Sequence, residues 1–554
     1  MSNLNGDILY LIFKELELNE EFRSCLLVNK TWCQIIIPTL WKDPWKYLNK
    51  RKAKLFLNVI ISHLSDEMRN NLIQRINSDL LILRSCKKPY FNYISYCRNL
   101  NLIEIERLIN NITFRESSAD ISIIKNTILE LFINKNTKIS YLNIPYKFDI
   151  EIHLIPGAVR CFSELVSLRC STGVNDKILT GLMGICKSIE KLQLYIEADK
   201  NNYGIIELIE NSEKLLNIQL INNYSKIDQP FRKVLENSLI ERANSIQSFT
   251  ISKHPVTDIL PSFVHLKSLE LNDSNYNMSW DCKENLSLPL LQILKADNVP
   301  IDVLKNLIKN TNGSLIEIKI NGEYHDVVIN KEIIQIIYQN CPKLENLKLL
   351  LRNDNILELE NLLKTCDSLN GLNIIFSVFD DCIDWDYLFG ILVKFSPINL
   401  HKFKFFRFNK EPSLESLKSF FDNWSCPKLE NLLKKCQSLN GSNIMFGVFD
   451  DYFDYFDRDY LFEILTKFSP INLFKYKFFR FNEESNTESL KSIFDNWKCR
   501  HPILLQFPKM KNMVKNTTCI NLMEKYKLKG IIKKYNVSDE TTFEDFEWNQ
   551  KYFG

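Results

Sequence analysis

The chain has 554 residues, of which 45% are hydrophobic and 25% charged, as is typical of a folded soluble protein with several domains or a repeat array. Its net charge of +3 is small for this length, so we expect neither a nucleic acid nor an anionic membrane as its partner. The 15 cysteines follow no secretory signal, and no apolar run is long enough to cross a bilayer, so we expect reduced thiols in a cytoplasmic or nuclear protein.

The first 48 residues predict a module of three short helices. Asp7 can cap a first helix from Ile8, whose apolar side chains fall on adjoining faces. Apolar residues favour a second helix around 22–27 and a third around 32–36, which we expect to end near Pro38. Such a module buries little apolar surface, so it often depends on a partner or on the following domain.

A defined order of residues runs through this segment: Leu4, Asp7-Ile8-Leu9, Ile12-Phe13, Ser24-Cys25-Leu26-Leu27-Val28-Asn29-Lys30-Thr31-Trp32 and Leu40-Trp41. That order resembles the F-box, the helical module that docks a protein onto the Skp-type adaptor of a cullin-RING ubiquitin ligase. The resemblance implies that the adaptor contacts Leu4, Ile8, Leu9, Ile12, Val28, Trp32 and Leu40. One departure is Asn5, where the family usually has proline, and this change raises the ordering cost by ~0.5–1 kcal/mol. The alternative is an amphipathic helical cap without a partner.

Residues 49–125 predict a helical connector, with two helices within Ala53–Arg84. Over residues 126–500 a six-residue signature recurs, with apolar residues at its first, fourth and sixth positions. The last two fit the buried face of a short strand, and the intervening residues fit a return helix. The signature occurs at Ile139/Leu142/Ile144, Leu165/Leu168/Cys170, Ile189/Leu192/Leu194, Leu215/Ile218/Leu220, Ile246/Phe249/Ile251, Leu266/Leu269/Leu271, Leu291/Leu294/Ala296, Leu315/Ile318/Ile320, Leu344/Leu347/Leu349, Leu369/Leu372/Ile374, Leu400/Phe403/Phe405 and Leu473/Tyr476/Phe478.

The spacing of the signature, mostly about 20 to 31 residues, is that of leucine-rich repeats. Each unit has an apolar face that it cannot bury alone, so successive units should stack. Residues 359–428 return as 429–500, and a stacked array accepts such a duplication because each unit contacts only its neighbours. We therefore expect an α/β fold: an N-terminal three-helix F-box, then a curved leucine-rich-repeat solenoid with parallel strands on the concave face and helices on the convex face.

Cysteine recurs three residues before the first apolar position of several units, at Cys186, Cys341, Cys366, Cys426 and Cys436. Metal ligands or redox thiols are one interpretation. The favoured interpretation is a small apolar residue at each helix-to-strand corner, because the cysteines follow the repeat and do not form close pairs. The same placement is similar to the repeats of F-box/leucine-rich-repeat proteins.

The last part of the chain, residues 501–554, predicts a capping helix and a tail. Leu522–Tyr535 indicates a basic helix, interrupted by Gly530, and Ser538–Gly554 is acidic and aromatic.

Sequence patterns of catalysis are missing. There is no glycine-rich phosphate loop, no Cys-x-x-Cys pair and no His-x-x-x-His pair. We therefore expect no enzyme activity, no cofactor and no metal site in this chain.

The strand residues between the buried positions should face the concave surface and offer a binding site. In the duplicated units they place lysines beside an aromatic ring, with an arginine close by: Lys402, Lys404, Phe406 and Arg407, and again Lys475, Lys477, Phe479 and Arg480. We hypothesise that this basic-aromatic patch binds an acidic or phosphorylated target segment. The alternative is a solvated strand edge.

The resemblance implies the substrate-recognition subunit of an SCF-type ubiquitin ligase. The F-box would bind the Skp-type adaptor and through it the cullin-RING ligase, while the repeats would bind an unknown protein target. The alternative is a non-catalytic leucine-rich-repeat scaffold whose F-box-like cap does not engage the ligase.

Overall fold

The computed structural model describes residues 5–16, 25–46, 48, 53–75, 88–110, 118–222, 228–272, 286–321, 326–376, 383–397, 399–400, 402–406, 415–416, 419–420, 443–447, 475–477, 491, 494–495, 503–508 and 517–538, in some of these segments as backbone alone. The chain divides into two compact units, unit 1 over Met1–Leu266 and unit 2 over Lys267–Gly554.

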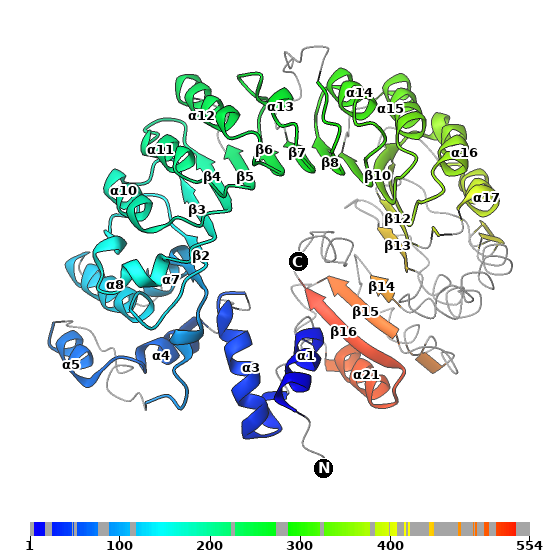
Figure 1. Ribbon diagram of the computed structural model, residues 1–554. Coiled ribbons are helices and arrows are strands. Elements are labelled where there is room, and N and C mark those ends of the chain that lie inside the picture. The colour runs from blue at the N-terminus through cyan, green and yellow to red at the C-terminus, as the bar shows by residue number, and fades with distance from the viewer. Residues whose placement is uncertain are drawn as a thin grey trace. The chain divides into compact units, whose positions relative to one another are not determined.

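Unit 1 begins with helices and continues as alternating strands and helices (Figure 1). Its strands pair in parallel and in sequence order. The helical start comprises α1 (Gly6–Leu16), η1 (Cys25–Leu27), α3 (Lys30–Lys42), α4 (Ala53–Ile61), α5 (Asp66–Arg75) and η2 (Tyr93–Tyr96). The alternating part comprises β1 (Asn99–Asn101), α7 (Leu102–Asn110), α8 (Ser118–Phe132), β2 (Tyr141–Asn143), η3 (Ile152–Leu154), α9 (Ala158–Phe162), β3 (Ser167–Ser171), α10 (Asp176–Ile185), β4 (Lys191–Ile196), α11 (Gly204–Glu210), β5 (Asn217–Asn222), α12 (Gln229–Glu241), β6 (Ser248–Ile251) and α13 (Ile259–Ser262).

Unit 2 contains two groups of parallel strands. In the first group β7 to β13 pair in sequence order, and in the second β14, β15 and β16 pair with one another. Its elements are β7 (Ser268–Asn272), β8 (Ile293–Asp297), α14 (Ile301–Lys309), β9 (Glu317–Asn321), α15 (Val327–Asn340), β10 (Asn346–Leu351), η4 (Asn353–Asn355), α16 (Ile356–Thr365), β11 (Gly371–Phe376), α17 (Trp385–Phe395), β12 (Lys402–Phe406), β13 (Asn443–Gly447), β14 (Lys475–Lys477), β15 (Ile503–Pro508), α21 (Thr517–Leu528) and β16 (Ile532–Ser538).

The apolar signature of the sequence coincides with the strands. In unit 1, Leu168, Leu192 and Ile218 are fully buried or nearly so, and their strands align them side by side. In unit 2, Leu347 and Leu372 are likewise fully buried and lie side by side on paired strands. Each such side chain contributes about 1.5–3 kcal/mol when it is fully buried. The period-two pattern therefore sets both the strand positions and their register, and the predicted mixed α/β fold with a parallel sheet is confirmed.

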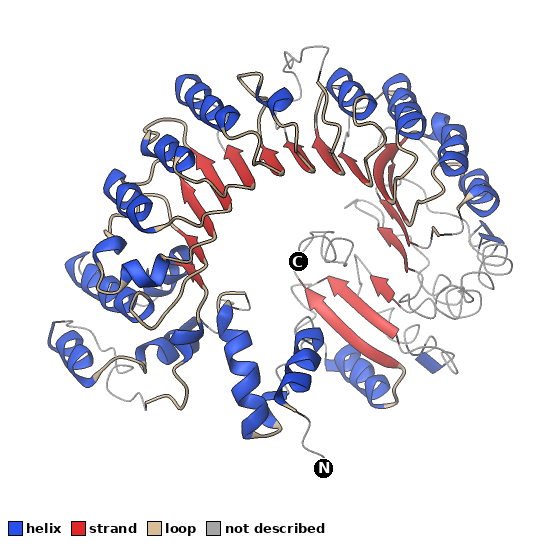
Figure 2. Cartoon of the chain, viewed as in Figure 1, coloured by secondary structure: helices blue, strands red, loops and turns tan. Residues whose placement is uncertain are grey.

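The helices of each unit lie on one side of its strands (Figure 2). The alternate strand residues, such as Gln193 and Gln219 in unit 1, are polar and half-buried. Parallel sheets usually carry helices on both faces and are apolar on both. In this protein helices cover one face of the strands, and the opposite face is polar.

The first helix starts differently from the prediction. Asp7 lies inside α1, and the residue before the helix is Asn5, whose Oδ1 accepts a hydrogen bond from the Asp7 N–H at 3.4 Å. The Asn5 carbonyl also accepts from the Leu9 N–H at 3.0 Å. Asparagine is a favoured helix cap, and an acidic residue in the first turn is stabilised by the helix dipole.

The expected end of the third helix near Pro38 is wrong. Helix α3 runs through Pro38 to Lys42. An interior proline costs about 3 kcal/mol. Trp41 offsets part of this by stacking on Phe56 and Tyr93, with ring centroids 5.5 and 4.9 Å apart. Tertiary contacts of the last turn thus keep the helix intact beyond the proline.

Two predictions for the later part of the chain also need correction. The helix expected over Leu522–Tyr535 ends at Leu528, and Gly530 adopts a φ of +74° before strand β16 begins. A residue without a Cβ adopts that backbone conformation readily. Among the strands of the described residues, the sequence signature also missed β1, β13, β15 and β16.

The recurring cysteines occupy helix-to-strand corners, as predicted. Cys186, Cys341 and Cys366 each follow a helix directly and donate their backbone N–H to its last turn at 2.7–2.9 Å. Burial raises the pKa of each of these thiols to about 12, so they are protonated at neutral pH. Cys426 and Cys436 lie outside the described residues.

Candidate interaction surfaces

The N-terminal module has a small core of its own. Leu9 and Phe13 of α1 are buried against Ile36 of α3. The ring of Phe13 meets that of Trp32 edge to face, with centroids 5.0 Å apart. Cys25 and Leu26 also pack against this core. The aromatic and apolar residues at these positions therefore hold the short helices together.

Asn29 explains part of the Leu-Val-Asn-Lys-x-Trp run. It adopts an extended conformation immediately before α3, and its Oδ1 accepts a hydrogen bond from the Trp32 N–H at 2.9 Å. A side chain that satisfies a free N–H at a helix start contributes about 0.5–2 kcal/mol. The run thus encodes a helix cap followed by an aromatic core residue one turn later.

The residues that the resemblance assigned to the adaptor differ in their exposure. Ile8, Ile12 and Val28 are exposed, with 47%, 41% and 55% of their surface accessible. Trp32 and Leu40 are partly buried against the small core. Leu9 is only 4% exposed and packs in the core of the module, so its assignment to the adaptor contact stays a prediction that the burial does not favour. Leu4 lies outside the described residues.

Two further exposed apolar residues belong to the same module. Leu11 shares a face of α1 with Ile8 and Ile12, because residues three or four apart lie on one side of a helix. Leu27 precedes Val28 and is also exposed. The period of α1 could have indicated Leu11, but η1 is too short to show a period. We call Ile8, Leu11, Ile12, Leu27 and Val28 the N-terminal apolar surface.

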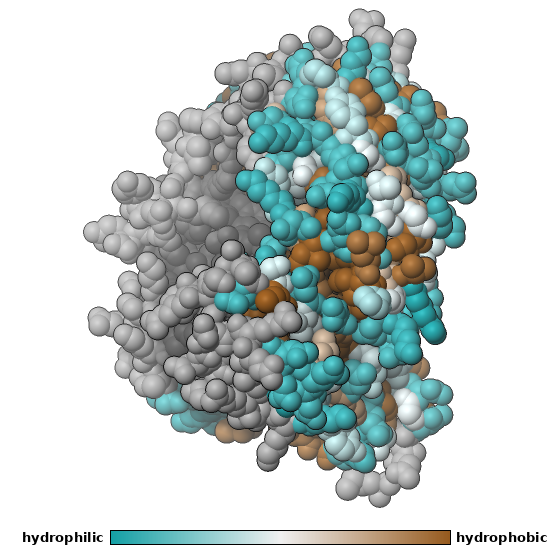
Figure 3. Space-filling view, turned by 90° about the vertical axis from the view of Figure 1, so that its left-hand side faces the viewer, coloured by the Kyte–Doolittle hydropathy of each residue, from teal (hydrophilic) through white to brown (hydrophobic). Residues whose placement is uncertain are grey.

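Exposed apolar residues occur elsewhere in unit 1 as well, for example Leu154 and Val159. In Figure 3 hydrophobic residues gather in an area that hydrophilic residues surround. Scattered exposed apolar side chains are normal for a protein surface. The N-terminal apolar surface differs because its residues follow one another on short elements that have only a small core beneath them.

Helix α3 joins this module to the first strand of unit 1. Trp45 follows the helix, and its Nε1–H donates a hydrogen bond to the Asn99 carbonyl of β1 at 2.6 Å. The backbone N–H of Arg98 donates to the Lys42 carbonyl at 3.0 Å. The module is therefore tied to the strand array by side-chain and backbone contacts.

The strand face of unit 1 is polar. Strand pairing places Arg169 of β3 beside Gln193 of β4, and Gln193 beside Gln219 of β5. The Arg169 guanidinium lies over the Tyr195 ring, 4.8 Å from its centroid, and donates to the Tyr195 hydroxyl. Gln193 donates to the same hydroxyl at 3.0 Å. These contacts fix the side chains of an otherwise open polar row.

The strand face of unit 2 carries a basic row. Strand register aligns Lys295 of β8, Lys319 of β9 and Lys348 of β10, which are half-buried. Neighbouring strands are about 4.8 Å apart, so the lysines follow one another across the strands at that spacing. Two acids accompany them: Glu270 lies 3.4 Å from Lys295, and buried Glu317 lies 2.9 Å from Lys319. We call Lys295, Lys319 and Lys348 the lysine row.

The predicted basic-aromatic patch is only partly described. Lys402 and Lys404 lie in β12, where register continues the lysine row from Lys348 through Asn373 to Lys404. Lys475 and Lys477 lie in β14, which pairs with β15 in the other group of strands. The two copies are therefore not neighbours in one row. The side chains of these lysines and of Phe406 are not described, and Arg407, Phe479 and Arg480 lie outside the described residues.

Within the described segments, no group of three or more histidine, cysteine, aspartate or glutamate residues is arranged to hold a metal ion. In the same segments no helix is long and apolar enough to cross a membrane. Compared with models of protein families and with curated proteins, the chain matches none.

Proposed function

We propose that the chain is the substrate-recognition subunit of an SCF-type ubiquitin ligase. The N-terminal module acts as the F-box and binds a Skp-type adaptor, and the strand array acts as a leucine-rich-repeat solenoid that binds the target protein. The chain contributes proximity, which raises the effective concentration of the target at the ligase.

The observation that supports this proposal most directly is the N-terminal apolar surface. Five large apolar side chains are exposed on α1 and at residues 27–28, although their own module has only a small core to support them. Association removes such side chains from water, and full burial of each contributes about 1.5–3 kcal/mol before the entropic cost of binding. A protein partner on this surface accounts for residues that folding leaves exposed.

The strand face is the proposed target-binding surface. A polar face is unusual for parallel strands, which are usually apolar on both faces. In unit 2 this polar face carries the lysine row. Lysines at successive strands suit an extended acidic or phosphorylated segment that crosses the strands. The basic-aromatic patch expected at Lys402, Lys404, Phe406, Arg407, Lys475, Lys477, Phe479 and Arg480 stays a prediction, and the lysine row that begins at β8 is proposed in addition to it.

Co-purification with a Skp-type adaptor tests the proposal. Ile8→Asp combined with Ile12→Asp should weaken adaptor binding at least about tenfold, because both charges would lie in the apolar contact. Leu154→Asp combined with Val159→Asp is the matched control, since these exposed residues of unit 1 lie outside the module. Leu9 is unsuitable as a test position because its replacement would damage the module core.

Binding by the control but not by the Ile8/Ile12 variant supports the proposal. If the unaltered chain binds no adaptor, the ligase proposal fails and the scaffold alternative takes its place. If both double variants bind as the unaltered chain does, the adaptor contact lies elsewhere and the assignment of this surface is wrong.

A further inference from the structure

Five asparagine residues of the chain are followed directly by glycine: Asn5, Asn312, Asn321, Asn370 and Asn440. In such a pair the backbone nitrogen of the glycine can attack the side-chain amide carbon of the asparagine, because glycine carries no side chain that hinders the approach. The surrounding structure decides whether a pair reacts, since the attacking nitrogen must be free and the asparagine must reach water.

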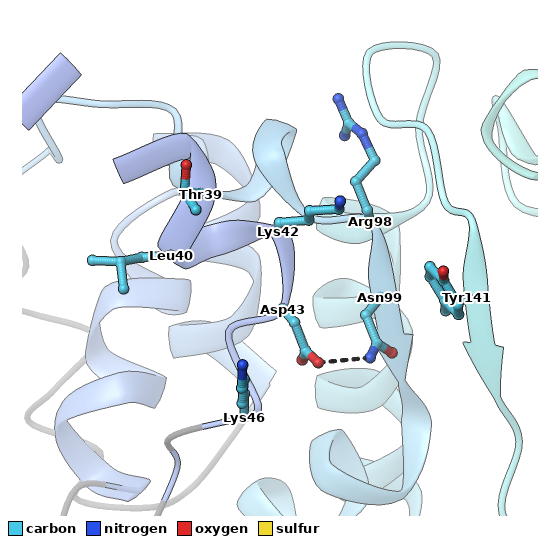
Figure 4. Close-up of a pocket in the computed structure, with 8 residues that line it drawn as sticks. All are labelled: Thr39, Leu40, Lys42, Asp43, Lys46, Arg98, Asn99 and Tyr141. Carbon is cyan, nitrogen blue, oxygen red and sulfur yellow. Dashed lines mark hydrogen bonds between the residues drawn. The ribbon is translucent and has the colours of Figure 1, made fainter. Parts of the chain in front are cut away.

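Two asparagines at the strands show what prevents the reaction. Gly371, which follows Asn370, is buried in β11, and its backbone N–H donates to the Glu345 carbonyl at 3.0 Å. Asn99 of β1 is followed by leucine, and its side-chain amide donates to the Asp43 carboxylate at 3.0 Å, as Figure 4 shows. A backbone nitrogen that is bonded in the strand ladder becomes available only when the strand opens locally.

Asn5 combines the opposite features. Its side chain is exposed, and a Cβ added to Gly6 would have nothing within 4 Å. Gly6 is the first residue of α1, so its N–H has no acceptor within the helix. Among the described residues, neither the Gly6 N–H nor the Asn5 Nδ2 donates a hydrogen bond. Both the attacking nitrogen and the leaving nitrogen are therefore unconstrained.

The Asn5 side chain lies over the nitrogen that would attack it. Its Oδ1 accepts a hydrogen bond from the Asp7 N–H, two residues further on, at 3.4 Å. This local turn folds the side chain back over the intervening Gly6 peptide. The side-chain amide carbon of Asn5 and the Gly6 nitrogen are therefore neighbours before any reaction.

We propose that Asn5 is a site of spontaneous covalent modification by deamidation. The Gly6 nitrogen gives its proton to the solvent and bonds to Asn5 Cγ, while the bond between Cγ and Nδ2 breaks and the amide nitrogen leaves as ammonia. Water then opens the resulting cyclic imide at either of its carbonyls. One opening gives aspartate and the other gives isoaspartate, in which the main chain runs through the side-chain carbons. The net reaction consumes water and releases ammonia, without oxidation or reduction.

The two products affect α1 differently. Aspartate can still cap the helix. In isoaspartate the carbonyl that accepts from the Leu9 N–H at 3.0 Å becomes a free carboxylate and is no longer held in place by the main chain. The start of α1 is then weakened, and this helix carries Ile8, Leu11 and Ile12 of the N-terminal apolar surface. We therefore expect isoaspartate to weaken adaptor binding, a consequence that rests on the proposed function.

Peptide mapping by mass spectrometry of the full chain, incubated in mildly alkaline buffer and sampled over time, tests the site. Asn5 should be converted at least about tenfold faster than Asn370, which must wait for local opening of its strand. Gly6→Ala should slow conversion at Asn5 at least about tenfold, because its methyl group obstructs the attack but has nothing within 4 Å to clash with. Gly184→Ala is the matched control, since its added Cβ is equally unobstructed, and it should leave the Asn5 rate unchanged.

The proposal is overturned if Asn5 is converted no faster than Asn370, or if Gly6→Ala leaves the rate at Asn5 unchanged. Adaptor binding by the incubated chain, compared with that of the fresh chain and of incubated Gly6→Ala, tests the consequence for α1. Binding that does not fall as isoaspartate accumulates would overturn that consequence. If the fresh chain binds no adaptor, the ligase proposal fails, whereas the peptide mapping still decides whether Asn5 is modified.

Discussion

At the scale of single residues, Gly157 shows how one position can be fixed by its backbone. It has a φ of +94° immediately before α9, and a Cβ placed there would lie 2.5 Å from the Lys135 backbone nitrogen. Two backbone segments thus meet where only a hydrogen atom fits. Gly184, in helix α10, has nothing within 4 Å of the same added atom. These two glycines form a matched pair for testing backbone constraint.

We expect Gly157→Ala to lower the free energy of unfolding by about 2 kcal/mol or more, because it combines an unfavourable φ with a backbone clash. Gly184→Ala should leave it unchanged or raise it by up to about 1 kcal/mol, because alanine favours the helix. Urea denaturation of both variants provides the measurement. A Gly157→Ala variant as stable as the Gly184→Ala variant would contradict the described contact with residues 134–135.

At the scale of elements, His63 links the end of α4 to the segment before η2. Its Nδ1 lies 2.8 Å from the Val59 carbonyl, and its Nε2 accepts from the Tyr93 N–H at 3.1 Å. The neutral ring with hydrogen on Nδ1 satisfies the contacts with Val59 and Tyr93, but it cannot donate to the Phe91 carbonyl, which lies 3.3 Å from Nε2. Burial lowers the pKa of His63 below its ordinary value near 6.5, so the folded chain prefers the neutral form.

This preference predicts an acid-dependent loss of stability. A lowered folded-state pKa means that the contribution of His63 is complete above the unfolded pKa and is lost as pH falls through the folded pKa. Between about pH 7.5 and about pH 5.5 the free energy of unfolding should therefore decrease more steeply for the unaltered chain than for His63→Gln. His265→Gln, at an exposed position, is the control and should keep the steep slope. Equal slopes for the His63 and His265 variants would show that His63 does not titrate in this way.

At the scale of the whole molecule, repetition turns single residues into surfaces. Lys295, Lys319 and Lys348 lie on three strands and are separated by more than twenty residues each, yet strand register brings them into one row. Glu270 and Glu317 partly neutralise the row, so its attraction for an acidic ligand should be weaker than that of three lysines alone. Binding by this surface should therefore be sensitive to charge and to salt.

We expect Lys295→Glu with Lys348→Glu to weaken binding of a fluorescent glutamate-rich peptide about tenfold or more, measured by anisotropy at low salt. Lys319 is left unchanged because its replacement by glutamate would put a second negative charge beside the buried carboxylate of Glu317. Lys309→Glu with Lys343→Glu, at exposed positions of unit 2 outside the row, is the control. If the control pair weakens peptide binding equally, the peptide responds to total charge and the lysine row is not its site.

The sequence by itself determined the position of most strands. An apolar residue at every second position of a short segment is a local requirement of a half-buried strand, and Leu168, Leu192 and Leu347 meet it without reference to distant residues. The same holds for the corner cysteines, whose regular spacing indicated their place. The signature missed β13, in which Ile444 and Phe446 align with Phe403 and Phe405 of β12, because Gly441 stands in the sequence where the pattern requires its first apolar residue.

Only the tertiary structure decided the candidate sites. Leu9 and Ile8 are adjacent apolar residues, and packing against Ile36 determines that one is buried and the other exposed. Helix α3 continues through Pro38 because distant aromatic residues receive its last turn. The lysine row assembles residues from separate strands. Their physical basis is long-range register and packing, which no local window of the sequence contains.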